Sequence, residues 1–180
     1  QEQGLSVDRA GFEASLNAQQ ERSRASSQFT GEVFATDALQ VRERVKGLPA
    51  KDDHFLGYER TEADAVIQGL WDGSHWVDEA REGQRVGIVL DHSPFYGEAG
   101  GQIGDAGTIG SVKGQGEVAQ TTWADDVLVH HAIVTSGRLK VQEKVKARVD
   151  VERRLRIARS HTATHLLHWA LHRVLGPEAV

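Results

Sequence analysis

The chain has 180 residues, enough for one ordinary domain or for a domain together with parts of its neighbours. Hydrophobic residues make up 39% and charged residues 26% of it, a balance that excludes a disordered or collagen-like chain. The formal net charge of −5 argues against a uniformly basic nucleic-acid binder, although it is compatible with a local basic stripe. The complete absence of cysteine excludes disulfides and thiolate-ligated metal sites within the chain.

Two further features concern the context of the chain. No apolar run is long enough to span a bilayer, and the first residues, QEQGLSVDRAGFE, are polar where a signal peptide would be apolar. These features favour a cytoplasmic protein. The sequence contains no methionine, even at position 1, which predicts a fragment of a longer protein.

The first 50 residues predict a helical linker that leads from a preceding domain. Within it, residues 5–27 carry helix formers, with Ser6 and Asp8 at the start and the apolar Phe12 and Leu16 on one face. The apolar stripe is narrow, which is typical of the end of a neighbouring domain or of a docking helix.

Residues 51–149 predict β-structure, because short runs are separated by turn signals about every eight to twelve residues. An Asp72-Gly73 pair predicts a hairpin turn. So many short strands without long helices between them favour a small, closed or nearly closed antiparallel barrel. The fold class is therefore mixed α+β and mainly β. The runs are HFLGYERTE, ADAVIQGLW, SHWVDEA, RVGIVLD, GEVAQTTWA, VLVHHAIVTSG and VKARVDVE.

Residues 150–180 predict a long helix, because no Gly or Pro interrupts the stretch before Gly176. Four histidines at spacings of four, three and four share one face: His161, His165, His168 and His172. Apolar residues form another face: Leu167, Ala170, Leu171 and Val174.

Histidines at positions i and i+4 of a helix direct their ring nitrogens to one point, as helical zinc sites require. No Glu follows His161, so the pattern is not the HExxH of zinc proteases. The alternative is that these histidines are ordinary surface or partly buried residues. Because two pairs overlap, spacing alone leaves the register of a metal site open.

The segment FYGEAGGQIGDAGTI has five glycines between Gly97 and Gly107. It matches neither phosphate-binding glycine pattern, so we exclude a nucleotide-phosphate loop. Either the glycines allow close approach of a ligand or they serve turns and tight packing in a bulged hairpin. Phe95 and Tyr96 fit either the core or a surface on which bases stack.

A basic cluster lies around the start of the long helix. It suits phosphate contacts, but the interleaved Asp150 and Glu152 also fit a solvated face. The cluster comprises Arg148, Arg153, Arg154, Arg156 and Arg159. The tryptophans are expected in the core or at an interface: Trp71, Trp76, Trp123 and Trp169.

In their order and spacing, FYGEAGGQIGDAGTI and RSHTATHLLHWALHRVLG resemble the alanyl-tRNA synthetase family. GLSVDRAGFEASLNAQQERSRA resembles the segment before that family's editing region, so the likeness covers nearly the whole chain. The resemblance implies a helical linker, a barrel like the second domain of translation elongation factors, and the first helix of an editing domain. It implies a parent enzyme that joins alanine to tRNA(Ala) using ATP and hydrolyses mischarged Ser-tRNA(Ala) and Gly-tRNA(Ala) with zinc.

The resemblance also implies roles for individual residues. His161 and His165 match the first two zinc ligands, and the others would come from a downstream Cys-x-x-x-His motif that this sequence lacks. Thr164 matches a position lining the pocket for the misattached amino acid, and His168 is left to packing. Substrate or tRNA contacts are expected from the glycine-rich segment, at Gly100, Gly101 and Gln102. No catalytic residue is assigned.

For partners and cofactors the resemblance implies tRNA(Ala), with no membrane or DNA, and leaves homo-oligomerisation of the parent open. ATP and Mg²⁺ would bind outside this chain. With half of its ligands missing, the isolated chain is expected to bind zinc weakly or not at all and to have little deacylase activity.

Two alternatives differ in class. The chain could act as a non-catalytic tRNA-binding barrel that uses the basic cluster near Arg153. It could instead be an independent zinc hydrolase whose oligomer combines His161 and His165 with carboxylates such as Asp150 or Glu178.

Overall fold

The computed structural model describes residues 55–99, 101–124 and 126–176. The chain divides into two units, Gln1–Ala35 and Thr36–Val180, and all described residues belong to the second. The predicted linker of residues 1–50, Gly100 and Glu178 lie outside the described residues.

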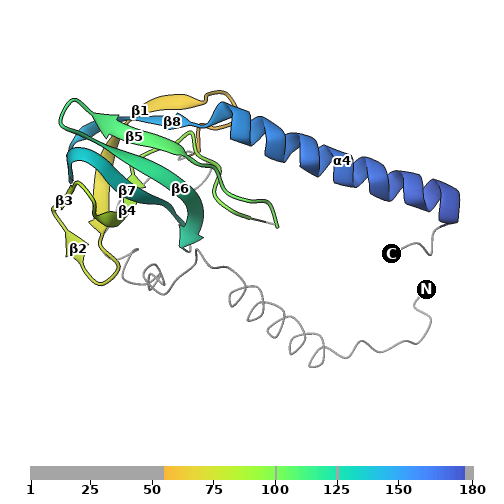
Figure 1. The fold of residues 1–180 in the computed structure, drawn as a ribbon, viewed down its shortest axis with the longest axis horizontal. Coiled ribbons are helices and arrows are strands. Elements are labelled where there is room, and N and C mark those ends of the chain that lie inside the picture. The colour runs from red at the N-terminus through yellow and green to blue at the C-terminus, as the bar shows by residue number, and fades with distance from the viewer. Residues whose placement is uncertain (1–54, 100, 125, 177–180) are drawn as a thin grey trace. The chain divides into compact units, whose positions relative to one another are not determined.

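The described part is a β-barrel followed by one long helix (Figure 1). Its elements are β1 (Glu62–Trp71), β2 (Trp76–Val77), β3 (Glu79–Arg81), β4 (Arg85–Leu90), β5 (Gly107–Ser111), β6 (Gly114–Ala124), β7 (Val127–Lys140), β8 (Lys144–Val149) and α4 (Val151–Leu175).

The barrel closes through antiparallel pairing of its first and last strands. The strands follow the order β2-β1-β4-β7-β6-β5-β8, and β1 also pairs with β8 from Glu62↔Arg148 to Val66↔Lys144. β3 pairs with β7 outside this path. Six strands therefore form a closed ring, which leaves none of them as a free edge. The predicted mainly-β antiparallel barrel is confirmed.

Alternation of side chains along the strands builds the core. In β1, Ala63, Ala65 and Ile67 are buried while the residues between them are more exposed, as the two-residue period of a strand requires. The same alternation in β6 and β8 brings apolar side chains into one interior cluster. Phe95 is fully buried there, so of its two predicted roles the core position is correct.

The Asp72-Gly73 turn is confirmed, and one predicted run is corrected. The Asp72 carboxylate accepts the N–H groups of residues 74 and 75, each at 2.7 Å, which closes the β1–β2 hairpin. The run HFLGYERTE is not a strand in its described part up to residue 61, and only its last residue, Glu62, belongs to β1. The Leu56 carbonyl instead accepts the N–H groups of Glu59 and Arg60 at 3.2 and 3.1 Å, which folds the backbone into a turn.

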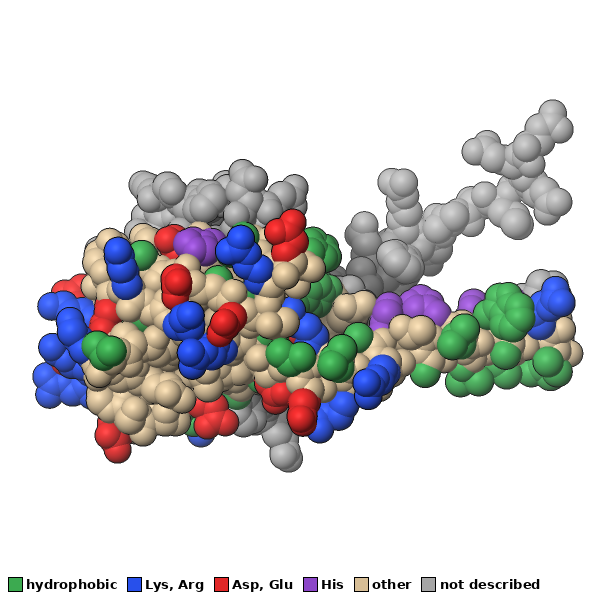
Figure 2. All heavy atoms as spheres, turned by 90° about the horizontal axis from the view of Figure 1, so that it is seen from above, with side chains coloured by type: hydrophobic (Ala, Val, Ile, Leu, Met, Phe, Trp, Pro, Cys, Tyr) green, Lys and Arg blue, Asp and Glu red, His purple; other side chains and the backbone are tan. Residues whose placement is uncertain are grey.

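The predicted long helix is confirmed at both ends. Asp150 caps the start, its carboxylate accepting the Arg153 N–H at 2.9 Å, and Gly176 follows the last turn with φ 95°. No residue of α4 is buried, and most of its apolar side chains are exposed beside the histidines (Figure 2). Trp169 is exposed as well, so among the described residues it is not part of the core. None of the helices described is both long and apolar enough to cross a membrane.

Candidate functional site

The glycine-rich loop between β4 and β5 is fastened to the start of α4 by an ion pair. The Asp105 carboxylate, almost fully buried, pairs with the Arg154 guanidinium, whose Nε donates to it at 3.0 Å. It also accepts the Tyr96 N–H at 2.7 Å. Arg154 donates further to the carbonyls of Gly57 at 3.1 Å and Pro94 at 2.6 Å. The ion pair and the backbone groups around it are therefore joined by hydrogen bonds in which one partner is charged.

A second set of contacts fixes the same loop on α4 and β6. Arg153 donates to the Gly104 carbonyl at 2.7 Å, and the Thr121 hydroxyl donates to the Asp105 carbonyl at 3.0 Å. A Cβ at residue 104 would collide with the Thr121 carbonyl oxygen, so only glycine fits there. Sequence reasoning missed Asp105. The signal available was a carboxylate between Gly104 and Gly107, in a stretch whose only other charged residue is Glu98.

The loop and the histidine helix meet at Gln102 and His161. The side-chain amide nitrogen of Gln102 lies 3.3 Å from Nδ1 and 3.2 Å from Nε2 of His161. These two residues are 59 positions apart in the sequence, and each was predicted to belong to the site. Gly101 precedes Gln102 with φ 81°, in a turn that reverses the chain near the tip of the loop.

Two histidine pairs follow along the helix. His161 and His165 have their Nε2 atoms 3.0 Å apart, and the Nε2 atoms of His168 and His172 are 3.1 Å apart. Because His168 is exposed and meets His172, its predicted packing role is wrong for the described residues. Thr164 donates its hydroxyl proton to the Ser160 carbonyl at 2.9 Å, one turn back.

A complete metal centre does not form among the described residues, where no three histidine or acidic side chains gather. The first pair nevertheless has the separation of two ligands on one ion. Two nitrogens bound tetrahedrally at zinc distances lie about 3.3 Å apart. Asp150, considered as a ligand from the sequence, instead caps the helix.

The basic cluster is mostly engaged within the molecule. Arg153 and Arg154 hold the loop, and Arg148 pairs with Glu62 at 3.2 Å on the barrel surface. Arg156 and Arg159 are exposed. The cluster thus divides into arginines that position α4 and arginines that face solvent.

Two adjacent histidines of β7, His130 and His131, are both buried. His130 Nδ1 donates to the Ile88 carbonyl at 2.9 Å, so its Nε2 accepts from the Ser93 hydroxyl at 2.7 Å. A Ser–His pair of this kind suits nucleophilic catalysis, but both side chains are fully buried and no substrate can reach them. Burial lowers the pKa of His131 to about 4, and its Nε2 lies 2.7 Å from the Thr122 hydroxyl.

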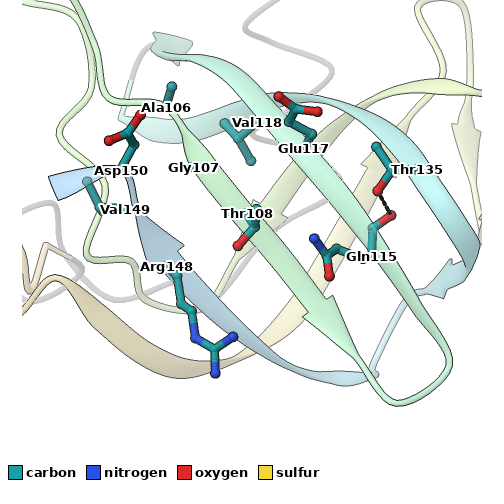
Figure 3. Close-up of a pocket in the computed structure, with 10 residues that line it drawn as sticks. All are labelled: Ala106, Gly107, Thr108, Gln115, Glu117, Val118, Thr135, Arg148, Val149 and Asp150. Carbon is teal, nitrogen blue, oxygen red and sulfur yellow. Dashed lines mark hydrogen bonds between the residues drawn. The ribbon is translucent and has the colours of Figure 1, made fainter. Parts of the chain in front are cut away.

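A separate hollow of about 300 Å³ lies over β5, β6 and β8 (Figure 3). Thr135 donates there to the Gln115 carbonyl at 3.2 Å. The hollow is lined by Gly107 from the predicted loop and by Arg148 and Asp150, but by neither Gln102 nor His161. The hollow is therefore separate from the site at Gln102 and His161.

Comparison with known proteins places the chain in a family. The family model described as "tRNA synthetases class II (A)" matches residues 1–153. The chain is 42% identical over 179 residues to the alanine–tRNA ligase of Dehalococcoides mccartyi, covering 98% of the chain and 20% of that protein. It is 43% identical over 177 residues to that of Thermus thermophilus, with 98% and 20% covered, and 41% identical over 176 residues to that of Shouchella clausii, with 97% and 19% covered. The chain thus spans about a fifth of the length of these relatives. On this evidence the chain belongs to the class II (A) tRNA synthetase family.

Proposed function

We propose that this chain is part of an alanine–tRNA ligase that attaches alanine to tRNA(Ala) using ATP. The observation that carries the proposal is the 41–43% identity to alanine–tRNA ligases over nearly the whole chain. That coverage includes both the glycine-rich loop and the histidine helix. ATP and Mg²⁺ bind outside this segment, tRNA(Ala) is the partner, and the enzyme works in the cytoplasm.

The segment from residue 150 onward begins an editing domain that hydrolyses Ser-tRNA(Ala) and Gly-tRNA(Ala). His161 and His165 are two ligands of its zinc ion, which the 3.0 Å separation of their Nε2 atoms supports. When bound, zinc supplies a Lewis acid that can polarise a water or orient the 3′-terminal nucleotide. The remaining ligands come from outside the described residues. The isolated chain therefore holds zinc weakly and has little deacylase activity.

In this proposal Thr164 and Gln102 help to recognise the misattached amino acid and the end of the tRNA. The Thr164 hydroxyl gives its proton to the Ser160 carbonyl, so its oxygen is left to accept a hydrogen bond from the hydroxyl of a misattached serine. Gln102 brings an amide from the glycine-rich loop against His161, with Gly100 and Gly101 beside it in sequence allowing close approach of the tRNA end. The enzyme needs a second pocket besides the one that selects alanine for attachment. One extra or missing group on an amino acid changes its binding free energy in a single pocket by only about 1–3 kcal/mol.

A chimeric enzyme tests the proposal. The matching segment of the Thermus thermophilus ligase is replaced by this chain, and alanylation of tRNA(Ala) and hydrolysis of Ser-tRNA(Ala) are both measured. We expect H161A/H165A to abolish hydrolysis and lose zinc while alanylation is retained. His75→Ala, at an exposed histidine of the β1–β2 turn, is the matched control and should change neither. Unchanged hydrolysis in H161A/H165A would contradict the editing role, and robust hydrolysis by the isolated 180 residues would contradict its incompleteness.

Binding of tRNA without catalysis is the second candidate, favoured by the exposure of Arg156 and Arg159. It predicts salt-dependent binding of tRNA by the isolated chain that R156A/R159A weakens. Under this candidate the chimera would show no hydrolysis attributable to the histidines.

A further inference from the structure

The second histidine pair of α4 has metal-binding geometry of its own. His168 and His172 lie on the same helix face as the first pair, and their ring centroids are 4.3 Å apart. His168 is exposed and His172 is half-buried, so an ion can reach both. Figure 2 shows histidine side chains gathered along one side of the helix. Nothing in the editing role proposed above uses this pair.

We propose that His168 and His172 form an independent binding site for a divalent transition metal ion such as Ni²⁺ or Cu²⁺. Two ligand nitrogens at ordinary bond lengths lie about 2.9 Å apart when they subtend a right angle at the ion. They lie about 3.3 Å apart in a tetrahedral site. The observed 3.1 Å between the Nε2 atoms falls between these values, so the rings need little rearrangement to chelate an ion.

The electron pairs of the two nitrogens explain why an ion is accepted. Two ring nitrogens 3.1 Å apart repel each other unless a proton or a cation lies between their lone pairs. In the metal-free molecule one Nε2–H donates to the other Nε2. When the ion binds, that proton moves to Nδ1 of the same ring, and both Nε2 lone pairs coordinate. The neutral pair therefore takes up the ion without net loss of a proton.

The cationic side chain next to the pair in the sequence is held by a neighbouring ring. Arg173 is next in the sequence, but its guanidinium lies over the Trp169 ring, 5.7 Å from the centroid. Its charge is thereby held on another side of the helix. The metal would keep open coordination positions for water or for a further ligand, since the pair supplies only two nitrogens.

The experiment titrates NiCl₂ into the full chain by calorimetry, with helicity followed by circular dichroism. We expect two equivalents for the wild-type chain, one for H161A/H165A, one for H168A/H172A and none when all four are replaced. His172→Ala alone, in the H161A/H165A background, should weaken binding about 100-fold because the chelate is lost. Alanine favours helix, so these variants should keep the circular dichroism of the wild type. His75→Ala is the control and should keep two equivalents.

H161A/H165A decides the question, because only the second pair remains in it. Failure of this variant to bind Ni²⁺ would overturn the inference, as would an unchanged stoichiometry in H168A/H172A. The inference does not rest on the editing role. Loss of editing in the chimera with Ni²⁺ binding intact at His168 and His172 would refute only the proposed function.

Discussion

Replacing Asp105 by asparagine should destabilise the chain strongly, because this carboxylate is the buried partner of Arg154. The substitution keeps an oxygen that can accept the Tyr96 N–H, but it removes the negative charge that receives the guanidinium. Breaking a buried ion pair costs about 3–5 kcal/mol. The Arg154 side chain is 22% exposed and can regain some hydration, so we expect the lower end, about 3 kcal/mol.

Guanidinium chloride denaturation measures this change. With a slope of about 4 kcal/mol/M, the midpoint should fall by about 0.7 M. A double-mutant cycle with Arg154→Gln should give a coupling free energy of about 2 kcal/mol, since each single change leaves the other group without its partner. Arg148→Gln, which breaks the exposed pair with Glu62, is the matched control and should cost about 1 kcal/mol or less.

Two results would refute the reasoning. One is a loss of less than about 0.5 kcal/mol in Asp105→Asn, which is the scale of an ordinary surface substitution. The other is additivity of the two substitutions, which would mean that the carboxylate and the guanidinium do not stabilise the fold through each other.

Three further predictions concern single residues. The lowered pKa of His131 means that the unfolded chain takes up a proton below about pH 6.5 that the folded chain refuses until about pH 4. The free energy of unfolding should therefore be at its full value above pH 6.5 and fall by about 3 kcal/mol toward pH 4. Urea titrations should show a shallower pH dependence of this free energy in His131→Gln. An equal pH dependence in both proteins would exclude His131 as its origin. Gly104→Ala forces a collision with the Thr121 carbonyl and should lower the melting temperature more than Gly101→Ala, where the added methyl meets open space. Asp150→Ala removes the helix cap and should cost about 1 kcal/mol, with faster hydrogen exchange confined to the first turn of α4; global loss of protection would contradict a local role.

The sequence alone determined the elements whose signals are local. The limits of α4 follow from Asp150 and Gly176, because a cap or a left-handed residue acts on the adjacent turn regardless of the rest of the fold. The barrel follows from alternating apolar residues and turn signals, since each strand carries its own two-residue period. The pairing of His161 with His165 is equally local, because one helical turn sets their separation.

Only the tertiary structure decided how the loop meets the helix. Arg154 and Asp105 are 49 residues apart and Gln102 and His161 are 59 apart, so no local period relates them. From the sequence, Arg154 fitted either a phosphate contact or, as is more usual for such a charge run, a solvated face. Closure of the barrel places the Asp105 carboxylate at the start of α4. Because the carboxylate is buried there, Arg154 forms an ion pair with it. Side-chain roles that depend on which distant partner is buried beside them are set by packing, and packing is a property of the whole chain.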